Sequence, residues 1–528
     1  MRNWWKSLIG KEATPDRAPM RPSRAISQRM YASARASRLT NGWTPSNSSA
    51  DSELVSSLTT MRSRSRALVR DASYAKRARV LVVNNVIGTG IGLQAQVRTT
   101  RGELAARVND EIEAVWAEWG EADSCHTGGR LAFKSLERAL MAQVFEAGEV
   151  FIRKHHVAFG NSRIPFALEV IEAERLADEL TSPFLQAQTG NEVRMGVEVD
   201  RFGRPVAYYI RERHPSEFRF SGGAPDRVER VPADQIIHLA VIDRWPQTRG
   251  EPWLHTVIRR LADMDGYSEA EVIRARAQAV RMGIIETPED SAAFGESQSD
   301  GSVEMELEPG IVTRLQPGEK WHDSAPTAPN PQLDPFMRYM LREMAAGTGP
   351  SYESLSRDYS QSNYSSSRLA LLDDRDLWRF YQAWFICDFR QRIHREWLQA
   401  AVFSRAITSI RLEEYGVDPR KFEAVRFKPR GWSWVDPTKE VAAFKEAVMA
   451  GFTTVGDVIA QTAGGRDIED VLDERAQELE LMREKSLVFD TSPEAYEQPD
   501  PAPPPEPDPE PEDTKEDPPA RVFSFLRK

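Results

Sequence analysis

The sequence contains very little cysteine and no long hydrophobic run. Its 528 residues include only Cys125 and Cys387, which lie far apart. Two separated thiols cannot form a disulfide framework or a zinc site, so we expect reduced cysteines. No stretch of about 20 apolar residues is present, and residues 1–11 lack the apolar segment and cleavage site of a secretory signal. We therefore expect no membrane-spanning helix and no secretion signal.

Catalytic and metal-binding motifs are also missing. The chain has no Walker A motif, no Gly-x-Ser-x-Gly elbow and no His-Glu-x-x-His motif. Residues 88–92 are rich in glycine but lack the lysine and hydroxyl residue of a phosphate-binding loop, so they predict a turn that enters a strand. His155 and His156 are adjacent and point to different sides, and the other histidines are scattered. We expect no catalytic residue, no metal and no cofactor, which favours a structural role.

Positive charge is not in excess, and the net charge is −11. A nonspecific DNA-binding protein usually has a clear basic surplus. The charge is nevertheless uneven, because residues 1–80 carry 16 Lys and Arg against 5 Asp and Glu. Residues 491–520 contain 10 acidic residues and 11 prolines, a composition typical of a disordered tail.

Hydrophobic spacing predicts an α+β fold that is mainly helical. Apolar residues recur at helical spacing on both sides of Asp71, and helices are also expected over residues 102–120 and 131–147. Strands are expected near residues 149–156, 166–171 and 235–240, with a hairpin around Gly203. The longest helical patterns cover residues 253–282 and 367–404, and residues 438–484 predict two or three more helices.

Six stretches, in this order, resemble the portal proteins of lambda-like tailed phages. The most specific is the "DYSQSNYSSSR" run within Tyr352–Arg368, and another is the arginine-rich "MRSRSR" that precedes the glycine-rich turn. Residues 70–73 depart from the family, which usually has an Asn-Asn-Pro-like turn there. The stretches are Leu58–Leu93, Ala147–Arg153, Gly196–Tyr208, Ile237–Pro252, Tyr352–Arg368 and Trp434–Lys439.

The resemblance implies the portal fold, with a wing, a two-helix stem, a small α/β clip, a helical crown and a disordered C-terminal tail. It implies the following division: basic, partly disordered arm 1–50, wing 51–252, stem helix 253–282, clip 283–330, stem helix 331–346, tunnel loop 347–366, long wing helix and return 367–437, crown 438–490 and tail 491–528.

The function implied is that of a portal subunit at one capsid vertex. Such proteins form a ring, usually of twelve copies, through which double-stranded DNA is packaged and ejected, and they are not enzymes. The resemblance places the tunnel loop in the channel, which makes Arg357, Tyr359, Ser360, Asn363, Tyr364 and Arg368 candidate DNA-facing residues. Arg357 and Arg368 would make transient phosphate contacts, unless they form ion pairs within or between subunits.

The resemblance also implies partners other than DNA. The terminase large subunit and head-completion or adaptor proteins would dock on the clip, and the portal would contact major capsid and scaffold proteins but no membrane. Candidate docking residues are Glu308, Arg314, Glu319 and Trp321. The protein would be assembled in the host cytoplasm and would reside in the virion.

Two other functions compete with this interpretation. Asp373, Asp374 and Asp376 have the composition of a metal-dependent nuclease site, although a charged, solvated helix face is the simpler interpretation. The basic region 1–80 would suit a monomeric DNA-binding adaptor. Metal-dependent cleavage would support the first alternative, and tight, salt-sensitive DNA binding by a monomer would support the second.

Overall fold

The computed structural model divides the chain into two units, residues 1–431 and 432–528, and each is described by itself. The described residues are 47–181, 190–217, 227–280, 283–286, 296–297, 303–304, 320–323, 330–432, 437–462 and 468–487.

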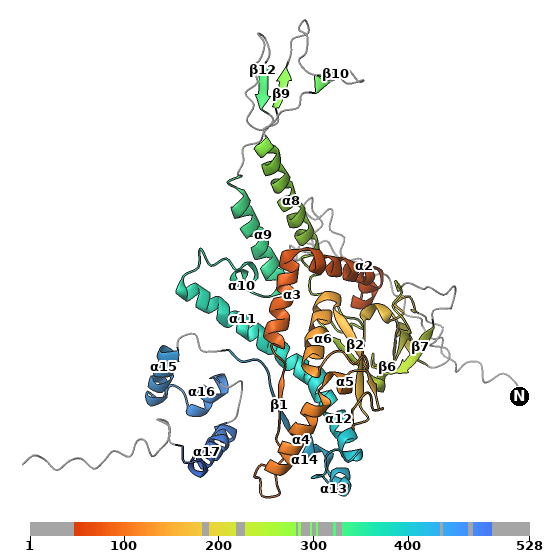
Figure 1. Cartoon of the computed structure of the whole chain (residues 1–528), viewed down its shortest axis with the longest axis vertical. Helices are drawn as coiled ribbons and strands as arrows, with labels where there is room; N and C mark the ends of the chain where they lie inside the picture. The colour runs from red at the N-terminus through yellow and green to blue at the C-terminus, as the bar shows by residue number, and fades with distance from the viewer. Residues whose placement is uncertain are drawn as a thin grey trace, which may run out of the picture. The chain divides into compact units, whose positions relative to one another are not determined.

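The first unit begins with two helices that meet at Ala72. Helix α2 (Ala50–Asp71) starts at Ser49, whose side chain accepts a hydrogen bond from the Ser52 amide at 3.2 Å. Ala72 has an extended backbone, which ends α2 before α3 (Ser73–Val86) begins. Both helices therefore confirm the sequence prediction, and they lie next to α6 in Figure 1.

Two antiparallel sheets form the centre of this unit. The first has β2 (Glu149–His155) between β3 (Ala167–Ile171) and β8 (Ile236–Ala240), which confirms all three predicted strands. The second has the order β4-β5-β6-β7, and its β5–β6 pair is the predicted hairpin. Phe151 of β2 packs in one buried cluster with Val197 and Tyr208 of the second sheet. The strands of the second sheet are Glu192–Arg194, Val197–Val199, Pro205–Arg211 and Val228–Pro232.

Helices α4 (Ala106–Trp119) and α6 (Phe133–Ala147) confirm two further predictions, and the short α5 (Ala122–Cys125) lies between them. The glycine-rich segment turns as expected, with Gly88 and Gly90 at φ 65° and 113°. It enters β1 (Gly92–Ala95), which pairs with the distant β13 (Val425–Lys428).

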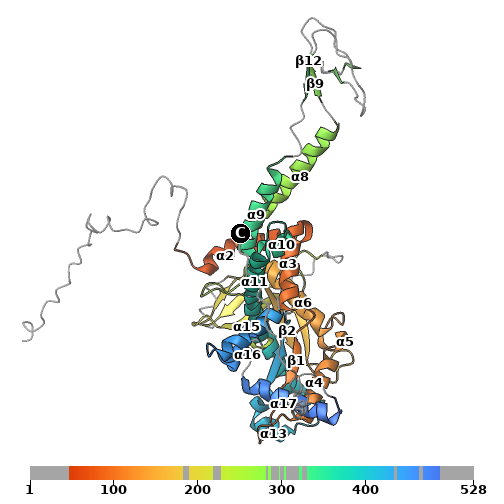
Figure 2. The same cartoon turned by 90° about the vertical axis from the view of Figure 1, so that its left-hand side faces the viewer.

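Helices α8 (Ile258–Val280) and α9 (Leu333–Thr348) lie side by side in both views (Figures 1 and 2). Arg260 and Glu343 connect them through a 3.1 Å ion pair. α8 begins five residues later than predicted for the first stem helix, because residues 253–257 form turns. In the segment between the helices, β9 (Gly283–Glu286) pairs with β12 (Lys320–Asp323), and β10 (Glu296–Ser297) pairs with β11 (Val303–Glu304).

The predicted tunnel loop is more ordered than the sequence suggested. Within residues 347–366 the chain forms α10 (Tyr352–Ser356) and the first turn of α11 (Tyr364–Phe385). The prediction of an irregular segment was wrong here, because Ser351 and Asn363 act as N-caps and start the two helices.

The predicted long helix 367–404 is continuous but not uniform. Helix α11 passes through a π-helical turn, Ile386–Arg390, into α12 (Gln391–Phe403). Short helices α13 (Leu412–Val417) and α14 (Pro419–Phe422) then lead to β13.

The second unit contains α15 (Pro437–Met449), α16 (Val455–Thr462) and α17 (Ile468–Glu484) in its described part. Three helices there match the expected number for residues 438–484. Across the described parts of both units, no helix has the length and apolar character needed to cross a membrane. The fold is α+β and mainly helical, as predicted.

Candidate functional site

The segment from α10 to the start of α11 carries all six side chains predicted to face a channel. Arg357 ends α10 in a left-handed conformation, with φ at 59°, and its side chain is exposed. Tyr359 and Tyr364 are 59% and 58% exposed. Large aromatic rings with this exposure on a single short segment are available for contacts beyond the monomer.

The other three candidates are Ser360 and Asn363, which form hydrogen bonds within the segment, and Arg368, which is half-buried. The Ser360 hydroxyl donates to Asp358 Oδ1 at 2.6 Å. Asn363 Oδ1 accepts from the Ser366 amide at 2.8 Å, and the Ser366 hydroxyl accepts from the Asn363 amide at 3.0 Å, which forms a capping box for α11. Arg368 is half-buried in the second turn of that helix. Ser360 and Asn363 therefore stabilise the segment itself.

Asp358 organises the α10–α11 loop, which comprises residues 357–363. Its Oδ1 accepts from the Ser360 hydroxyl and amide, and its Oδ2 accepts from the Tyr352 hydroxyl at 2.8 Å. These hydrogen bonds, first that of the Ser360 hydroxyl, lower the pKa of Asp358 to about 2. The loop is thus held by a carboxylate that the sequence analysis did not single out.

Neighbouring helices hold both ends of this segment. Arg338 of α9 lies 3.5 Å from Asp358 Oδ2, and the Arg342 guanidinium lies 5.3 Å from the centre of the Tyr352 ring. From α3, Arg77 donates two hydrogen bonds, of 3.0 and 3.3 Å, to the Ser354 carbonyl oxygen at the end of α10. That carbonyl is one of those left without a partner inside a short helix.

Asp374 has a structural position rather than a catalytic one. It is only 4% exposed and accepts from the Ser351 amide and hydroxyl and from the Ser354 hydroxyl. The expectation that residues 373–376 form a solvated face was therefore wrong for this residue, which helps to start α10. Asp373 and Asp376 are exposed, and Asp376 pairs with Arg379 at 2.9 Å.

A buried charge cluster connects α2 to the first sheet and to the segment that follows β8. Glu149 and Arg249 are both fully buried, and Arg249 Nη2 lies 2.6 Å from Glu149 Oε1. Arg62 of α2 and His238 of β8 also bind Glu149, each at 2.9 Å, and Asp178 binds Arg249 at 2.5 Å. We call Glu149, Arg249, Arg62, Asp178 and His238 the buried ion cluster.

Pairing outweighs desolvation in the buried ion cluster. Burial alone would raise the pKa of Glu149, but the Arg249 charge, the His238 hydrogen bond and the Arg62 charge hold it well below its usual range. Close backbone approach makes this geometry possible. A Cβ atom on Gly148 would lie 2.3 Å from the Glu251 carbonyl carbon, and Gly250 donates its amide to Glu149 at 2.9 Å.

The buried ion cluster brings together three stretches that are far apart in the sequence. Arg62 comes from the "MRSRSR" stretch, Glu149 from "AGEVFIR", and His238 and Arg249 from residues 237–252. The sequence analysis identified each stretch, but it did not predict that their charged residues contact one another in the fold. Arg66 of the same helix binds Glu174 at 2.7 Å, so these arginines of the basic region are engaged inside the fold rather than available to DNA.

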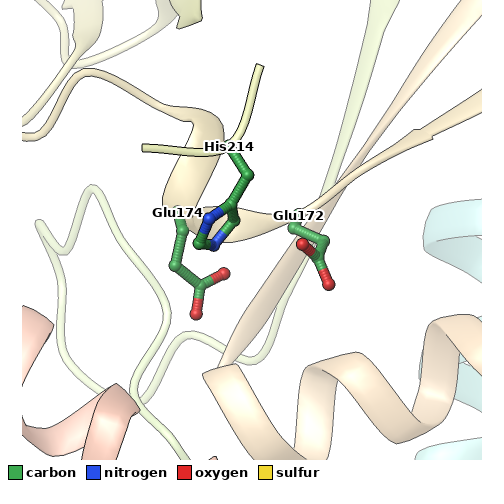
Figure 3. Close-up of side chains that lie close together, drawn as sticks. All are labelled: Glu172, Glu174 and His214. Carbon is green, nitrogen blue, oxygen red and sulfur yellow. The ribbon is translucent and has the colours of Figure 1, made fainter. Parts of the chain in front are cut away.

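Glu172, Glu174 and His214 form the one group of possible metal ligands found among the described residues (Figure 3). Their ligand atoms lie within 4.8 Å of one another. Two contacts compete with a metal. Glu174 receives two hydrogen bonds from Arg66, at 2.7 and 2.9 Å, and His214 Nδ1 accepts from the Ser216 amide, which places the proton of a neutral ring on Nε2. The group therefore suits a charged hydrogen-bond network better than a metal ion.

The predicted docking residues mostly fall outside the described residues, as Glu308, Arg314 and Glu319 do. Trp321 lies in β12, opposite Ile285 of β9. Their role stays a prediction.

Comparison with solved structures gives only weak similarities. A chain from "Neck of empty GTA particle computed with C6 symmetry" aligns with a TM-score of 0.42 and 15% identity, covering 76% of this chain and 94% of that one. A chain from "Neck of native GTA particle computed with C12 symmetry" gives 0.41 and 14%, with the same coverage.

Sequence comparison gives long matches. A probable portal protein of Halomonas phage phiHAP-1 is 28% identical over 488 residues, or 90% of both chains. Portal protein B of Escherichia phage lambda is 22% identical over 479 residues, covering 83% of this chain and 86% of the relative. The family model described as "Phage portal protein, lambda family" matches residues 36–382, which is more than half of the chain. The protein therefore belongs to the lambda family of phage portal proteins and is a structural component of the virion's portal vertex, not an enzyme.

Proposed function

We propose that twelve copies of this chain close into a ring and that the α10–α11 loop lines a channel for double-stranded DNA. One observation carries the proposal: the loop exposes Arg357 and Tyr359 while Asp358, the acid between them, is engaged by hydrogen bonds. Arg357, the more exposed of the two candidate arginines, would supply a phosphate contact that can form and break, and Arg368 remains the second candidate. Tyrosine rings and hydroxyl groups supply weaker contacts to the backbone.

The charge balance supports passage rather than tight binding. Each Lys or Arg that neutralises a phosphate adds affinity and salt dependence, and many such contacts would hold the duplex in place. The chain has a net charge of −11, and Arg62 and Arg66 are paired with carboxylates inside the fold. These two arginines are therefore not available to bind DNA phosphates.

Exposed apolar side chains on one face of α11, which also carries the exposed Asp373 and Asp376, support contact between copies. Leu369 and Phe380 are 71% and 63% exposed, and Leu372 lies on the same side of the helix. The opposite side packs inward through Asp374, Trp378 and Phe385. A second copy of this chain is the proposed occupant, because ring closure requires one surface of each subunit to meet a different surface of the next.

Further partners follow from the family. We assign terminase and head-completion docking to residues 283–330, and contacts with capsid and scaffold proteins to the outer parts of the ring. Assembly in the host cytoplasm belongs to the same proposal. No contact of the described residues favours the nuclease alternative, since Asp374 is committed to Ser351 and Ser354.

The test combines electron microscopy with a DNA-packaging assay. Purified protein is expected to form rings in negative stain, and persistence as a monomer under every assembly condition would contradict the proposal. Arg357→Ala is expected to leave rings intact but to change packaging rate and its salt dependence. The matched control is Arg411→Ala, which removes an arginine that is also exposed but lies outside the loop. Packaging by Arg357→Ala that equals the control would remove the loop from the channel.

A further inference from the structure

One face of α9 is directed at the α10–α11 loop. Asp334, Arg338 and Arg342 are spaced by four residues, so they share a side of the helix. Arg338 lies 3.1 Å from Asp334, 3.5 Å from Asp358 Oδ2 and 3.5 Å from the Ser360 hydroxyl. Arg342 covers the Tyr352 ring. A single helix face therefore contacts both α10 and the loop.

The Asp358 carboxylate joins these parts through both of its oxygens. Oδ1 accepts from the Ser360 amide and hydroxyl, which closes the loop on itself. Oδ2 faces the Tyr352 hydroxyl and Arg338, which connects the loop to α10 and to α9. Both flanking side chains, Arg357 and Tyr359, are exposed. The residue between these two exposed side chains is therefore the one whose contacts connect the loop to α9 and α10.

We propose that Asp358 and Arg338 form a latch that makes the α10–α11 loop move with α9, so that α9 sets where Arg357 and Tyr359 meet DNA. The inference rests on the proposed function for its DNA-facing part. Asp358 and Arg338 act as positioning residues, because they bind the loop rather than the duplex. Tyr352, with Arg342 above its ring, is a second tie between the same elements.

The latch gives α9 a mechanical role. α9 follows directly after residues 283–330, the segment proposed for docking of the motor and connector proteins. A shift of α9 on docking would displace Arg338 and, through Asp358, the loop. Docking on the segment before this helix would then alter the contacts that the loop offers to DNA.

Hydrogen exchange of assembled full-length rings tests the latch without any activity measurement. The decisive variant is Arg338→Gln, which leaves the Asp358 bonds to Ser360 and Tyr352 in place. It is expected to accelerate amide exchange of residues 357–363 by about tenfold, with Arg338→Lys restoring protection. Asp358→Asn should give at least the same acceleration, and adding Arg338→Gln to it should cause little more. The matched control is Glu118→Gln, which breaks an exposed ion pair with Arg163 away from the loop.

Two outcomes would overturn the latch: loop exchange within twofold of the unmodified protein in Arg338→Gln, or effects of the two substitutions that simply add. Packaging then separates the latch from the proposed function. If Arg338→Gln loosens the loop and Arg357→Ala changes nothing in packaging, the latch stands and the channel assignment fails. If Arg357→Ala impairs packaging while Arg338→Gln leaves exchange unchanged, the channel assignment stands and the latch fails.

Discussion

Two arginine–carboxylate centres in this protein have similar chemistry and opposite surroundings. Glu149 and Arg249 have no exposed surface, and each has further charged partners. Asp358 and Arg338 lie at the edge of the fold, with side chains 29% and 21% exposed. A buried pair must stay complete, because an unpaired charge cannot recover its hydration, whereas a partly exposed pair can open and close. The buried centre is therefore suited to fixing the fold, whereas partial exposure allows the second centre to open and close.

The largest expected effect tests the fixed centre. Arg249→Met removes a buried guanidinium and leaves Arg62 as the only arginine that the described contacts place on both Glu149 and Asp178. We expect the free energy of unfolding to fall by about 3–5 kcal/mol, measured by urea denaturation of the full chain. The control is Arg163→Met, which breaks the exposed pair with Glu118 and should cost less than about 1 kcal/mol. Equal losses of unfolding free energy in the two variants would contradict the argument that a buried ion pair matters more for stability than an exposed one.

The next effect concerns pH and a buried histidine. His394 is 2% exposed, and its Nε2 has no hydrogen-bond partner among the described residues. Burial, with the nearby charges of Arg390 and Arg395, lowers the pKa of His394 from 6.5 to about 3. Below pH 6.5 the unfolded chain takes up a proton that the folded chain refuses, so stability falls as the pH drops from about 6.5 towards 3.

His394→Phe should remove this loss of stability in acid and keep the tilted ring contacts with Trp116 and Trp397. Relative to the unmodified protein, the variant should gain about 2 kcal/mol between pH 8 and pH 5, measured from urea midpoints at both values. Parallel changes in the two proteins would show that another group controls acid sensitivity.

The sequence predicted most elements of the fold because their signals are local. Apolar spacing predicted α2, α3, α4 and α6, and alternation predicted β2, β3 and the β5–β6 hairpin. The pairing of β1 with β13 could not be predicted, since over 300 residues separate the strands. The π-helical turn was also missed, although a signal exists. Phe385, Phe389, Ile393 and Trp397 are all buried at a strict spacing of four, which an ideal helix cannot keep on one face without an extra residue.

The sequence predicted where the site lies along the chain, but it did not predict the contacts that hold the site together. The serine- and tyrosine-rich stretch correctly drew attention to residues 352–368. Asp358 was missed because its partners Tyr352 and Arg338 lie 6 and 20 residues before it, and no periodic pattern connects them. Arg62 was interpreted as part of a basic region because a sequence does not show that an arginine is buried beside Glu149.

A smaller effect is expected at Asp374, a buried acid that binds only neutral donors in the contacts described above. Asp374→Asn keeps the size of the side chain but weakens the hydrogen bonds from Ser351 and Ser354. We expect a loss of about 1–2 kcal/mol and faster amide exchange at the start of α10. The exposed neighbour provides the control, since Asp373→Asn should change stability by less than about 0.5 kcal/mol. Equal behaviour of the two variants would contradict the capping role of Asp374.

The smallest effect is expected for the pH dependence of the Asp358–Arg338 latch. The pKa of Asp358 is lowered from 3.8 to about 2, so the contribution of its carboxylate is present above pH 3.8 and is lost only as the pH falls through about 2. Between pH 8 and pH 5 the body of the protein should lose stability through His394, while protection of the α10–α11 loop, corrected for intrinsic exchange, should change by less than about twofold. Loop protection that fell together with the stability of the body would mean that the loop opens only when the fold does. The Arg338–Asp358 contact would then be a passive part of the core, and the contrast between the two centres would not hold.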